Sequence, residues 1–224
     1  MPSDFRFSGY LETEEVRAII NNISAVSLHP ERDALLLELL WQSGARVSEA
    51  ITLKPERVGL TSVVLRNLKQ MKRIKVEGGP TDLTHYTKVH DDSATKEVEV
   101  SKELCQQIKD FCQKNDIEES QWIFKGNMHP ERHLSSWYVW WIVTRASAKA
   151  GVFRFGKKHP RTGGKFKGAY PHLFRHSSAM HLLEETNNIM LVKQQLGYST
   201  VSTTQQYAYV KSQNIKKEVS KIKW

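Results

Sequence analysis

The sequence has few cysteines and no long apolar segment. Its 224 residues include only two cysteines, Cys105 and Cys112, which are too few for a disulfide scaffold or for a zinc site built from cysteines. No apolar run approaches the ~18 residues that a transmembrane helix needs, and the first residues lack the apolar core of a signal peptide. We therefore expect a cytoplasmic protein with no membrane association.

What the sequence does have is an ordinary globular composition and an uneven charge. Hydrophobic residues make up 39% and charged residues 25%, as in a folded chain of one or two domains. The net charge is +9. Residues 151–224 hold 13 basic and 3 acidic residues, whereas residues 1–150 hold 20 and 21. Such a concentration of positive charge favours a nucleic-acid partner over a merely solvated face.

Periodicity predicts a mostly helical chain. Thr13 is expected to cap the first helix, and Gly44 is a natural helix stop. The 3.6-residue pattern and these boundary signals predict helices over 13–22, 31–44, 45–53, 102–115, 137–150, 172–184, 189–196 and 202–210.

Strands are few. Residues 62–68 are rich in β-branched side chains and 95–100 alternate, so both are expected to be strands. A third strand over 121–124 could join them. The segment 69–94 between them is expected to be a long loop or an extended hairpin. The predicted fold class is therefore α+β, mostly α-helical, with a small antiparallel sheet.

Two predicted helices carry side chains that could have either a functional or a packing role. Cys105 and Cys112 are seven residues apart on one apolar face, and we interpret them as core residues. In the helix over 137–150, Trp137, Trp140, Trp141 and Thr144 share one side. Core packing is favoured for this stripe over base stacking.

Basic residues gather in two segments, one around residues 54–75 and one in the glycine-rich stretch 151–171. Clustered lysines and arginines in such segments are suited to phosphate contacts. The candidate nucleic-acid-binding residues are Lys72, Arg73, Lys75, Arg154, Lys157, Lys158, Arg161, Lys165 and Lys167.

One constellation is suited to chemistry on a phosphate. His172 and Arg175 are three residues apart on a predicted helix, so they project from one face. Arg46 is followed three residues later by Glu49. Two arginines and a histidine suit a phosphate, because each guanidinium offers a planar fork of donors. His172 and His176 imitate a helical zinc pair, but no third ligand is evident, so no metal site is predicted.

Three segments together resemble a known family. GARVSEA (44–50), HLFRHSSAMHLLE (172–184) and LGYSTVSTTQQYAYV (196–210) resemble the signature boxes of the tyrosine recombinases, which include phage integrases and Xer recombinases. Their order and spacing fit those of the family, and the three segments resemble its Xer-like branch. The resemblance covers roughly residues 10–210.

The resemblance implies a catalytic domain over residues 13–210. Residues 1–12 would be an N-terminal segment, and 211–224 a tail that docks on a neighbouring subunit or folds back. Too few residues precede the catalytic domain for the family's separate core-binding domain, which implies a fragment or a minimal enzyme.

The resemblance also implies an activity. The enzyme would be a site-specific recombinase that cuts a strand of double-stranded DNA through a 3′-phosphotyrosyl bond, as a homotetramer, at the nucleoid, with no metal, ATP or other cofactor. Arg46 and Arg175 would bind the scissile phosphate, and His172 would either accept a proton or donate a hydrogen bond to the phosphate. Glu49 would orient Arg46, and Tyr207 would be the nucleophile.

Two of the implied positions leave alternatives. The family's general-acid lysine matches Lys69 best, with Lys72, Lys75 and Lys96 as competitors. Tyr198 stands where the family usually has His or Trp; its hydroxyl can donate to a phosphate but cannot carry positive charge.

Tyr209 competes with Tyr207 for the role of nucleophile. The two residues are about 200° apart on a helix, so both cannot face one phosphate. The position relative to LGYST favours Tyr207.

Other functions stay open at this point. They are a nicking–closing enzyme of the type IB topoisomerase kind, a DNA-binding regulator that keeps the fold without catalysis, and a metal-dependent hydrolase.

Overall fold

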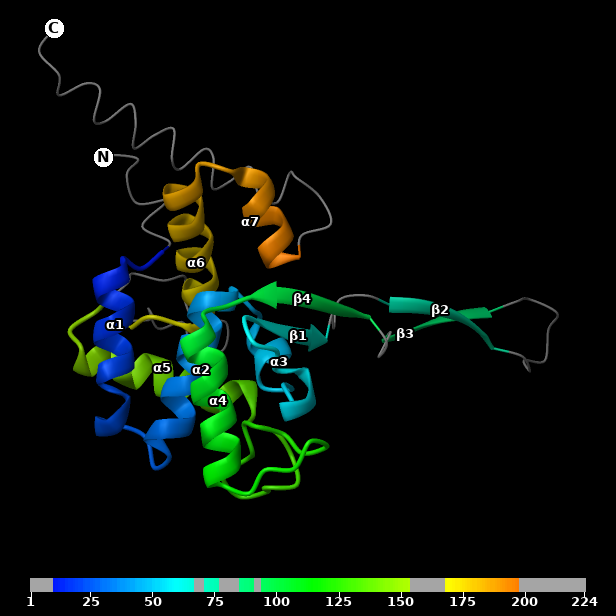
Figure 1. Ribbon diagram of the computed structural model, residues 1–224, viewed down its shortest axis with the longest axis horizontal. Coiled ribbons are helices and arrows are strands. Elements are labelled where there is room, and N and C mark those ends of the chain that lie inside the picture. The colour runs from blue at the N-terminus through cyan, green and yellow to red at the C-terminus, as the bar shows by residue number, and fades with distance from the viewer. Residues whose placement is uncertain (1–9, 67–70, 77–84, 91–93, 154–167, 198–224) are drawn as a thin grey trace, which may run out of the picture.

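The computed structural model in Figure 1 describes residues 10–66, 71–76, 85–90, 94–153 and 168–197, with 71–76 and 85–90 described by their backbone pairing alone. Helices dominate these residues, and the strands form two small antiparallel sheets. The predicted fold class is confirmed.

The chain enters through helix α1 (Thr13–Asn21), which leads by a 3-10 turn (Ile23–Ala25) to α2 (Pro30–Ser43). The prediction that Thr13 caps α1 is wrong by one residue. Glu12 is the N-cap, because its backbone N–H donates to Glu15 Oε2 at 2.9 Å and closes a capping box. The end of α2 is as predicted: Gly44 takes the left-handed conformation with φ of 59°.

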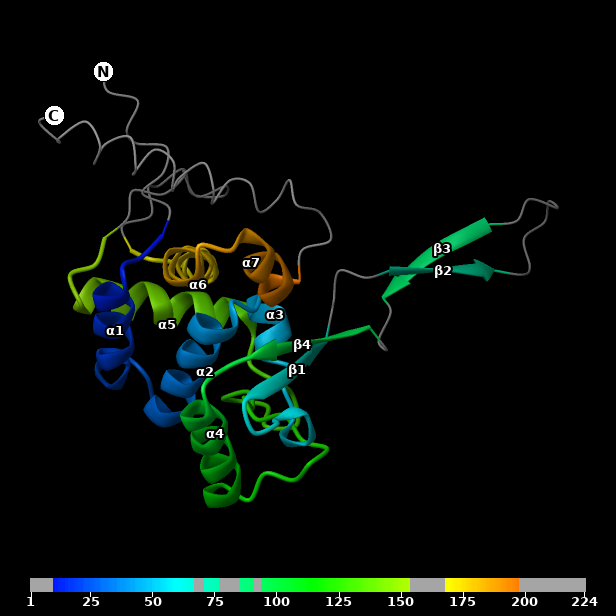
Figure 2. The same cartoon turned by 45° about the horizontal axis from the view of Figure 1, so that its top comes forward.

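Helix α2 is the centre of the core. Its leucines at positions 35, 36, 37, 39 and 40 are all buried, so the helix is covered on nearly every side. Helices α1, α4 (Lys102–Lys114) and α6 (Pro171–Thr186) pack around it, as Figures 1 and 2 show.

The main sheet pairs β1 (Ser62–Arg66) with β4 (Thr95–Glu99) antiparallel, which confirms both predicted strands over their described parts. Val63 and Val98 face each other in the register and are fully buried. The expected third strand over 121–124 is wrong. That segment is irregular, and Ile123 N–H donates instead to the Leu53 carbonyl at 3.1 Å.

The segment between these strands forms a second hairpin, which matches the extended-hairpin alternative. Strand β2 (Met71–Val76) pairs antiparallel with β3 (His85–His90). Both views place this hairpin beyond the end of the β1–β4 sheet, away from the helices.

Helix α5 (Ser136–Lys149) buries a different face from the one predicted. Trp137 is 68% exposed, whereas Val139, Ile142 and Val143 are fully buried. Branched and small side chains let the helix axis come closer to its neighbours than a row of indoles would. The ring of Trp141 lies partly in solvent, under the Arg145 guanidinium at 4.6 Å.

The interpretation of the cysteines is confirmed. Cys105 and Cys112 are unpaired and buried on the core face of α4. Burial raises the pKa of the Cys112 thiol to about 11, so this thiol stays protonated at neutral pH and is a poor nucleophile.

The last described elements are α6 and α7 (Ile189–Leu196), both as expected from the sequence. The Asn188 side chain caps α7 by accepting from the backbone N–H groups of Met190 and Leu191. The predicted helix over 202–210 lies outside the described residues. No helix in the described part of the chain is both long and apolar enough to cross a membrane.

A buried carboxylate fastens α2 to α5. Asp33 is fully buried and accepts hydrogen bonds from Ser27 Oγ at 2.6 Å, Arg32 Nε at 2.8 Å and the Tyr138 hydroxyl at 2.7 Å. Asp33→Ala leaves the buried Arg32 guanidinium without its anion. We expect a loss of about 3 kcal/mol in the free energy of unfolding in urea.

The matched control is Asp110→Ala on the exposed face of α4, where the carboxylate accepts a hydrogen bond from the Gln106 side chain at 2.8 Å. It should change stability by no more than about 0.5 kcal/mol. Equal losses for the two variants would contradict the role given to Asp33.

Candidate active site

The site is organised around the carboxylate of Glu49. Helix α3 (Val47–Ala50) begins at Arg46, whose backbone N–H donates to Glu49 Oε2 at 3.0 Å. The Arg46 guanidinium reaches the other carboxylate oxygen, with 2.5 Å between Nη1 and Oε1. The Glu49 side chain is wholly buried and that of Arg46 is 19% exposed. Glu49 therefore contacts both the backbone N–H and the guanidinium of Arg46, and it caps α3 as well.

A lysine from strand β4 completes the environment of this carboxylate. Lys96 Nζ lies 3.0 Å from Glu49 Oε2 and 3.4 Å from the carbonyl oxygen of Leu196 at the end of α7. Its side chain is 11% exposed. Lys96 thereby joins the segment after α2, the sheet and the end of α7.

Arg175 approaches the same carbonyl from α6. Its Nη2 donates to the Leu196 oxygen at 2.9 Å, and its Nη1 donates to the Gly44 oxygen. Both acceptors lie at helix C-termini, where unpaired carbonyls concentrate partial negative charge. Arg175 is 1% exposed, so its orientation is set by the protein.

Two glycines permit this convergence. A Cβ on Gly44 would lie 2.3 Å from Leu196 Cδ2, and a Cβ on Gly197 would lie 2.9 Å from Lys96 Cδ. Both glycines also have positive φ, 59° and 65°. The ends of α2 and α7 can therefore approach Arg175 and Lys96 only because these positions carry no side chain.

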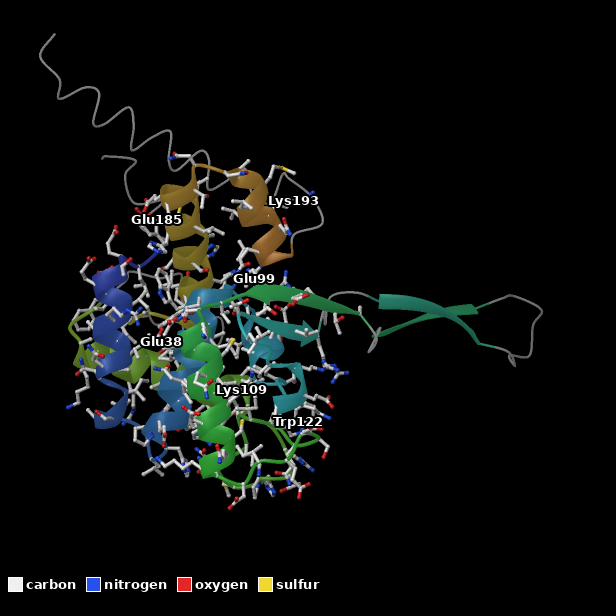
Figure 3. The ribbon with its side chains drawn as sticks, in the orientation of Figure 1. Glu38, Glu99, Lys109, Trp122, Glu185 and Lys193 are labelled. Carbon is white, nitrogen blue, oxygen red and sulfur yellow. The ribbon has the colours of Figure 1, made fainter. Side chains whose placement is uncertain are left out.

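A side-chain amide holds α7 against β4. Gln195 Nε2 donates to the Glu99 carbonyl at 2.6 Å, and Glu99 N–H donates back to Gln195 Oε1 at 3.3 Å. In Figure 3 the labelled Glu99 and Lys193 mark the two elements at this junction. The Leu196 carbonyl is thereby fixed relative to the strand that carries Lys96.

Two histidines lie on the helix that carries Arg175. His172 is one turn before Arg175, and its ring meets that of His176 edge-on, with 4.6 Å between centroids. Burial, and next the charge of Arg175, lower the pKa of His176. Among the residues that the structure describes, no three His, Cys, Asp or Glu side chains gather as a metal site would require.

The electrostatic balance of the site is positive. Burial alone would raise the pKa of Glu49, but the Lys96 ammonium and the hydrogen bond from Arg46 N–H outweigh it, and the pKa is lowered. The pKa of Lys96 is also lowered, mainly by burial and further by the charges of Arg175 and Arg46, against the opposing effect of Glu49. With all four groups ionised, the site holds three cations and one carboxylate, which leaves two net positive charges to attract an anion.

The structure thus places four predicted residues around one region: Arg46, Glu49 and Arg175 by the contacts above, and His172 by its place on α6. Lys69, Tyr198 and Tyr207 lie outside the described residues. So do Arg154, Lys157, Lys158, Arg161, Lys165 and Lys167. Lys72, Arg73 and Lys75 are on β2, described by its backbone alone.

Lys96 was predicted only as a competitor for another lysine's role. The available signal was the alternation of the strand over 95–100: residue 96 shares a face with Val98, and that face is the buried one. A lysine on the core face of a strand needs an acidic partner, and Glu49 is that partner.

Solved structures with this arrangement of helices and strands are tyrosine recombinase catalytic domains. The chain is similar to the crystal structure of the XerA recombinase, with a TM-score of 0.63 and 20% identity, over 92% of this chain and 60% of that one. It is also similar to the catalytic domain of bacteriophage HP1 integrase, with a TM-score of 0.53 and 18% identity, over 89% and 86%. The fold is therefore that of a tyrosine recombinase catalytic domain.

The sequence matches the Phage integrase family over residues 9–214, and the chain belongs to that family. It is 30% identical to tyrosine recombinase XerA of Thermococcus kodakarensis over 95% of this chain and 62% of that protein. It is 28% identical to tyrosine recombinase XerD of Staphylococcus saprophyticus, over 96% and 62%. The chain thus spans a little over three fifths of the length of these relatives.

The ionised state of Glu49 has a measurable consequence for stability. Because its pKa in the folded protein is lowered from 4.5, the stabilisation is fully present above that value and is lost as the pH falls through the folded pKa. Glu49→Gln lacks this titration. We expect the gap in free energy of unfolding between wild type and Glu49→Gln to be large at pH 7 and to narrow as the pH falls below 4.5.

The control is Glu31→Gln, since Glu31 pairs with Lys114 at 2.7 Å on the surface, with both side chains more than half exposed. Exposed pairs contribute little, so its gap should be small at every pH. A gap for Glu49→Gln that does not change with pH would show that its carboxylate is not held ionised.

Proposed function

We propose that this chain is the catalytic domain of a site-specific DNA recombinase that cuts and rejoins strands of double-stranded DNA through a 3′-phosphotyrosyl bond, without metal or ATP. The observation that carries the proposal is the cationic site. Arg46 and Lys96 are fixed on the buried Glu49 carboxylate, and Lys96 shares the Leu196 carbonyl with Arg175. Family membership supplies the reaction that needs such a site.

The chemistry follows from where charge develops. In the cleavage step the hydroxyl oxygen of Tyr207 bonds to the scissile phosphorus, and the bond from phosphorus to the 5′-oxygen breaks. Negative charge spreads over the phosphoryl oxygens, and guanidinium groups already fixed in place stabilise it without reorganising. Arg46 and Arg175 have this role in the proposal.

Two protons must move in the same step. The phenolic proton of Tyr207 passes to a base, for which we propose His172. The departing 5′-oxygen takes a proton from an acid, for which we propose Lys69, and the Tyr198 hydroxyl donates to a phosphoryl oxygen. Attack by the 5′-hydroxyl of another strand reverses the sequence and releases the tyrosine. The bond energy is kept in the covalent intermediate, so no nucleotide is consumed.

DNA is the proposed partner, with four copies of the chain acting on two duplexes. The structures of XerH bound to its difH substrate and of the lambda integrase dimer bound to a core site carry related folds on DNA, with TM-scores of 0.61 and 0.54 and identities of 18% and 17%. The basic segments of this chain are the proposed phosphate contacts.

The hairpin β2–β3 favours this assignment. Its two strands, MKRIKV and HYTKVH, hold four lysines and arginines and no acidic residue. In the register Arg73 stands opposite Lys88, and like charges directly opposite each other are unfavourable in a sheet unless an anion neutralises them. A DNA backbone running along the hairpin would do so.

The first test detects the covalent protein–DNA intermediate. A nicked suicide substrate, drawn from a pool that covers the native replicon, is incubated with the protein in EDTA, and adducts are resolved on a denaturing gel. We expect an adduct with wild type and none with Tyr207→Phe, which lacks the nucleophilic oxygen. Tyr209→Phe is the matched control and should retain the adduct. An adduct from Tyr207→Phe that disappears in Tyr209→Phe would move the nucleophile to Tyr209.

A second test concerns the hairpin. Replacing Lys72, Arg73 and Lys75 together by Ala should weaken DNA binding and reduce the slope of log K against log salt concentration by about 0.9 for each lost phosphate contact, or about 3 in all. Fluorescence anisotropy with a labelled duplex between low and moderate salt measures both. An unchanged slope would show that β2 makes no phosphate contact.

A further inference from the structure

We propose that Lys96 is a positioning residue for strand cleavage, acting on Glu49 and on the Leu196 carbonyl. The role rests on the function proposed above and extends it to a residue on the sheet. Lys96 enters the site from β4, a different element from those that carry Arg46 and Arg175.

The contacts of the ammonium point to this role. Two protein acceptors surround it, Glu49 Oε2 at 3.0 Å and the Leu196 carbonyl at 3.4 Å, and the side chain is 11% exposed. A general acid has to contact the leaving oxygen of the substrate. An ammonium held between two protein acceptors instead acts on those acceptors.

Each acceptor also binds one of the two arginines. Glu49 Oε2 accepts from Arg46 N–H as well as from Lys96. The Leu196 oxygen accepts from Arg175 Nη2 as well as from Lys96. Lys96 therefore shares one acceptor atom with the Arg46 backbone N–H and one with the Arg175 guanidinium, and it connects two arginines that come from distant parts of the sequence.

The surrounding structure leaves room for the aliphatic part of the Lys96 side chain. A Cβ on Gly197 would lie 2.9 Å from Lys96 Cδ, so the absence of a side chain at Gly197 provides the space that the stem occupies. Lys96→Met keeps most of this volume and removes the ammonium. Glu49 then loses the ammonium and keeps its contacts with Arg46, and the Leu196 carbonyl keeps its hydrogen bond from Arg175.

The experiment measures the rate of covalent adduct formation on the suicide substrate in a single turnover, together with DNA affinity. A misplacement of a catalytic group by about 1 Å costs about 100-fold in rate, and we expect that loss for Lys96→Met. Lys96→Arg should recover about tenfold of it, because a guanidinium fork can bond two acceptors. The matched control is Lys102→Met, because Lys102 is an exposed lysine at the start of α4. This variant should cleave at the wild-type rate, and its DNA affinity should equal that of Lys96→Met.

A pH profile separates positioning from general damage to the fold. The groups that face Glu49 are Arg46 from α3 and Lys96 from β4, while Arg175 from α6 acts on Lys96. Without the ammonium, burial still raises the pKa of Glu49 but its main opposing charge is gone. The acidic limb of the cleavage profile should therefore move to higher pH in Lys96→Met. A fold defect would scale the rate equally at every pH.

The double variant Lys96→Met with Glu49→Gln covers the case in which the single variant does not fold, because it leaves no uncompensated buried carboxylate. It should cleave as slowly as Glu49→Gln alone, since both changes break the same link. Multiplied losses in the double variant, or wild-type cleavage by Lys96→Met, would overturn the role of Lys96 while leaving the recombinase function standing. No adduct from wild type itself would overturn the recombinase function, and this role with it.

Discussion

A carboxylate that water cannot reach must be stabilised by cations and N–H donors, and Glu49 imposes this requirement on much of the fold. Its side chain has no exposed surface, and it receives Arg46 from its own short helix and Lys96 from the sheet. Removing one partner from such a cluster leaves a buried charge uncompensated, which is far more costly than losing a surface pair. The relative positions of α3 and β4 are thereby tied to the state of one acidic group. The contact thereby anchors a two-stranded sheet, which has little stability by itself, beside Arg46.

The second constraint is the use of helix ends as acceptors. Arg175 donates to carbonyl oxygens at the ends of α2 and α7. Carbonyls orient a guanidinium while cancelling only part of its charge. A carboxylate in the same place would neutralise it and would repel a phosphate. Among the described residues, Glu49 is the carboxylate in contact with Arg46 and Lys96, and the three cations outnumber it, so the balance of the site stays positive.

Local signals carried the sequence prediction a long way. Gly44 and the alternation around Val98 predicted the end of α2 and the strand β4, because both are decided within a few residues. The stripe that begins at Trp137 failed, since periodicity shows that a helix has an apolar face but not which of two apolar faces the core accepts. The third strand over 121–124 failed because its backbone partner, Leu53, comes from an irregular segment far away in the sequence.

The same contrast between local and tertiary information applies to the residues of the candidate site. Arg46, Glu49, His172 and Arg175 could be named because each lies in a motif with its own spacing. The place of Lys96 could not be deduced, because its contact with Leu196 O joins residues separated by 100 positions and depends on how α7 lies on β4. Only the burial of its strand face gave a hint. The missing information was tertiary, and it concerns the residue that joins the motifs rather than the motifs themselves.

The charged groups of the site and the remaining basic residues of the chain are suited to different tasks. The four charged groups of the site are largely enclosed, with exposed fractions between 0 and 19%, so their orientation is fixed before a substrate arrives and little reorganisation is needed at the moment of reaction. Enclosed groups with so few accessible donors are poorly suited to gripping a long polyanion. In the proposed function that task falls to basic residues elsewhere. Residues 151–224 carry 13 basic residues, Arg175 among them, against 3 acidic ones. Added salt should therefore weaken DNA binding strongly but lower the rate of strand cleavage within the bound complex only slightly. Screening acts on exposed charges and hardly on buried ones.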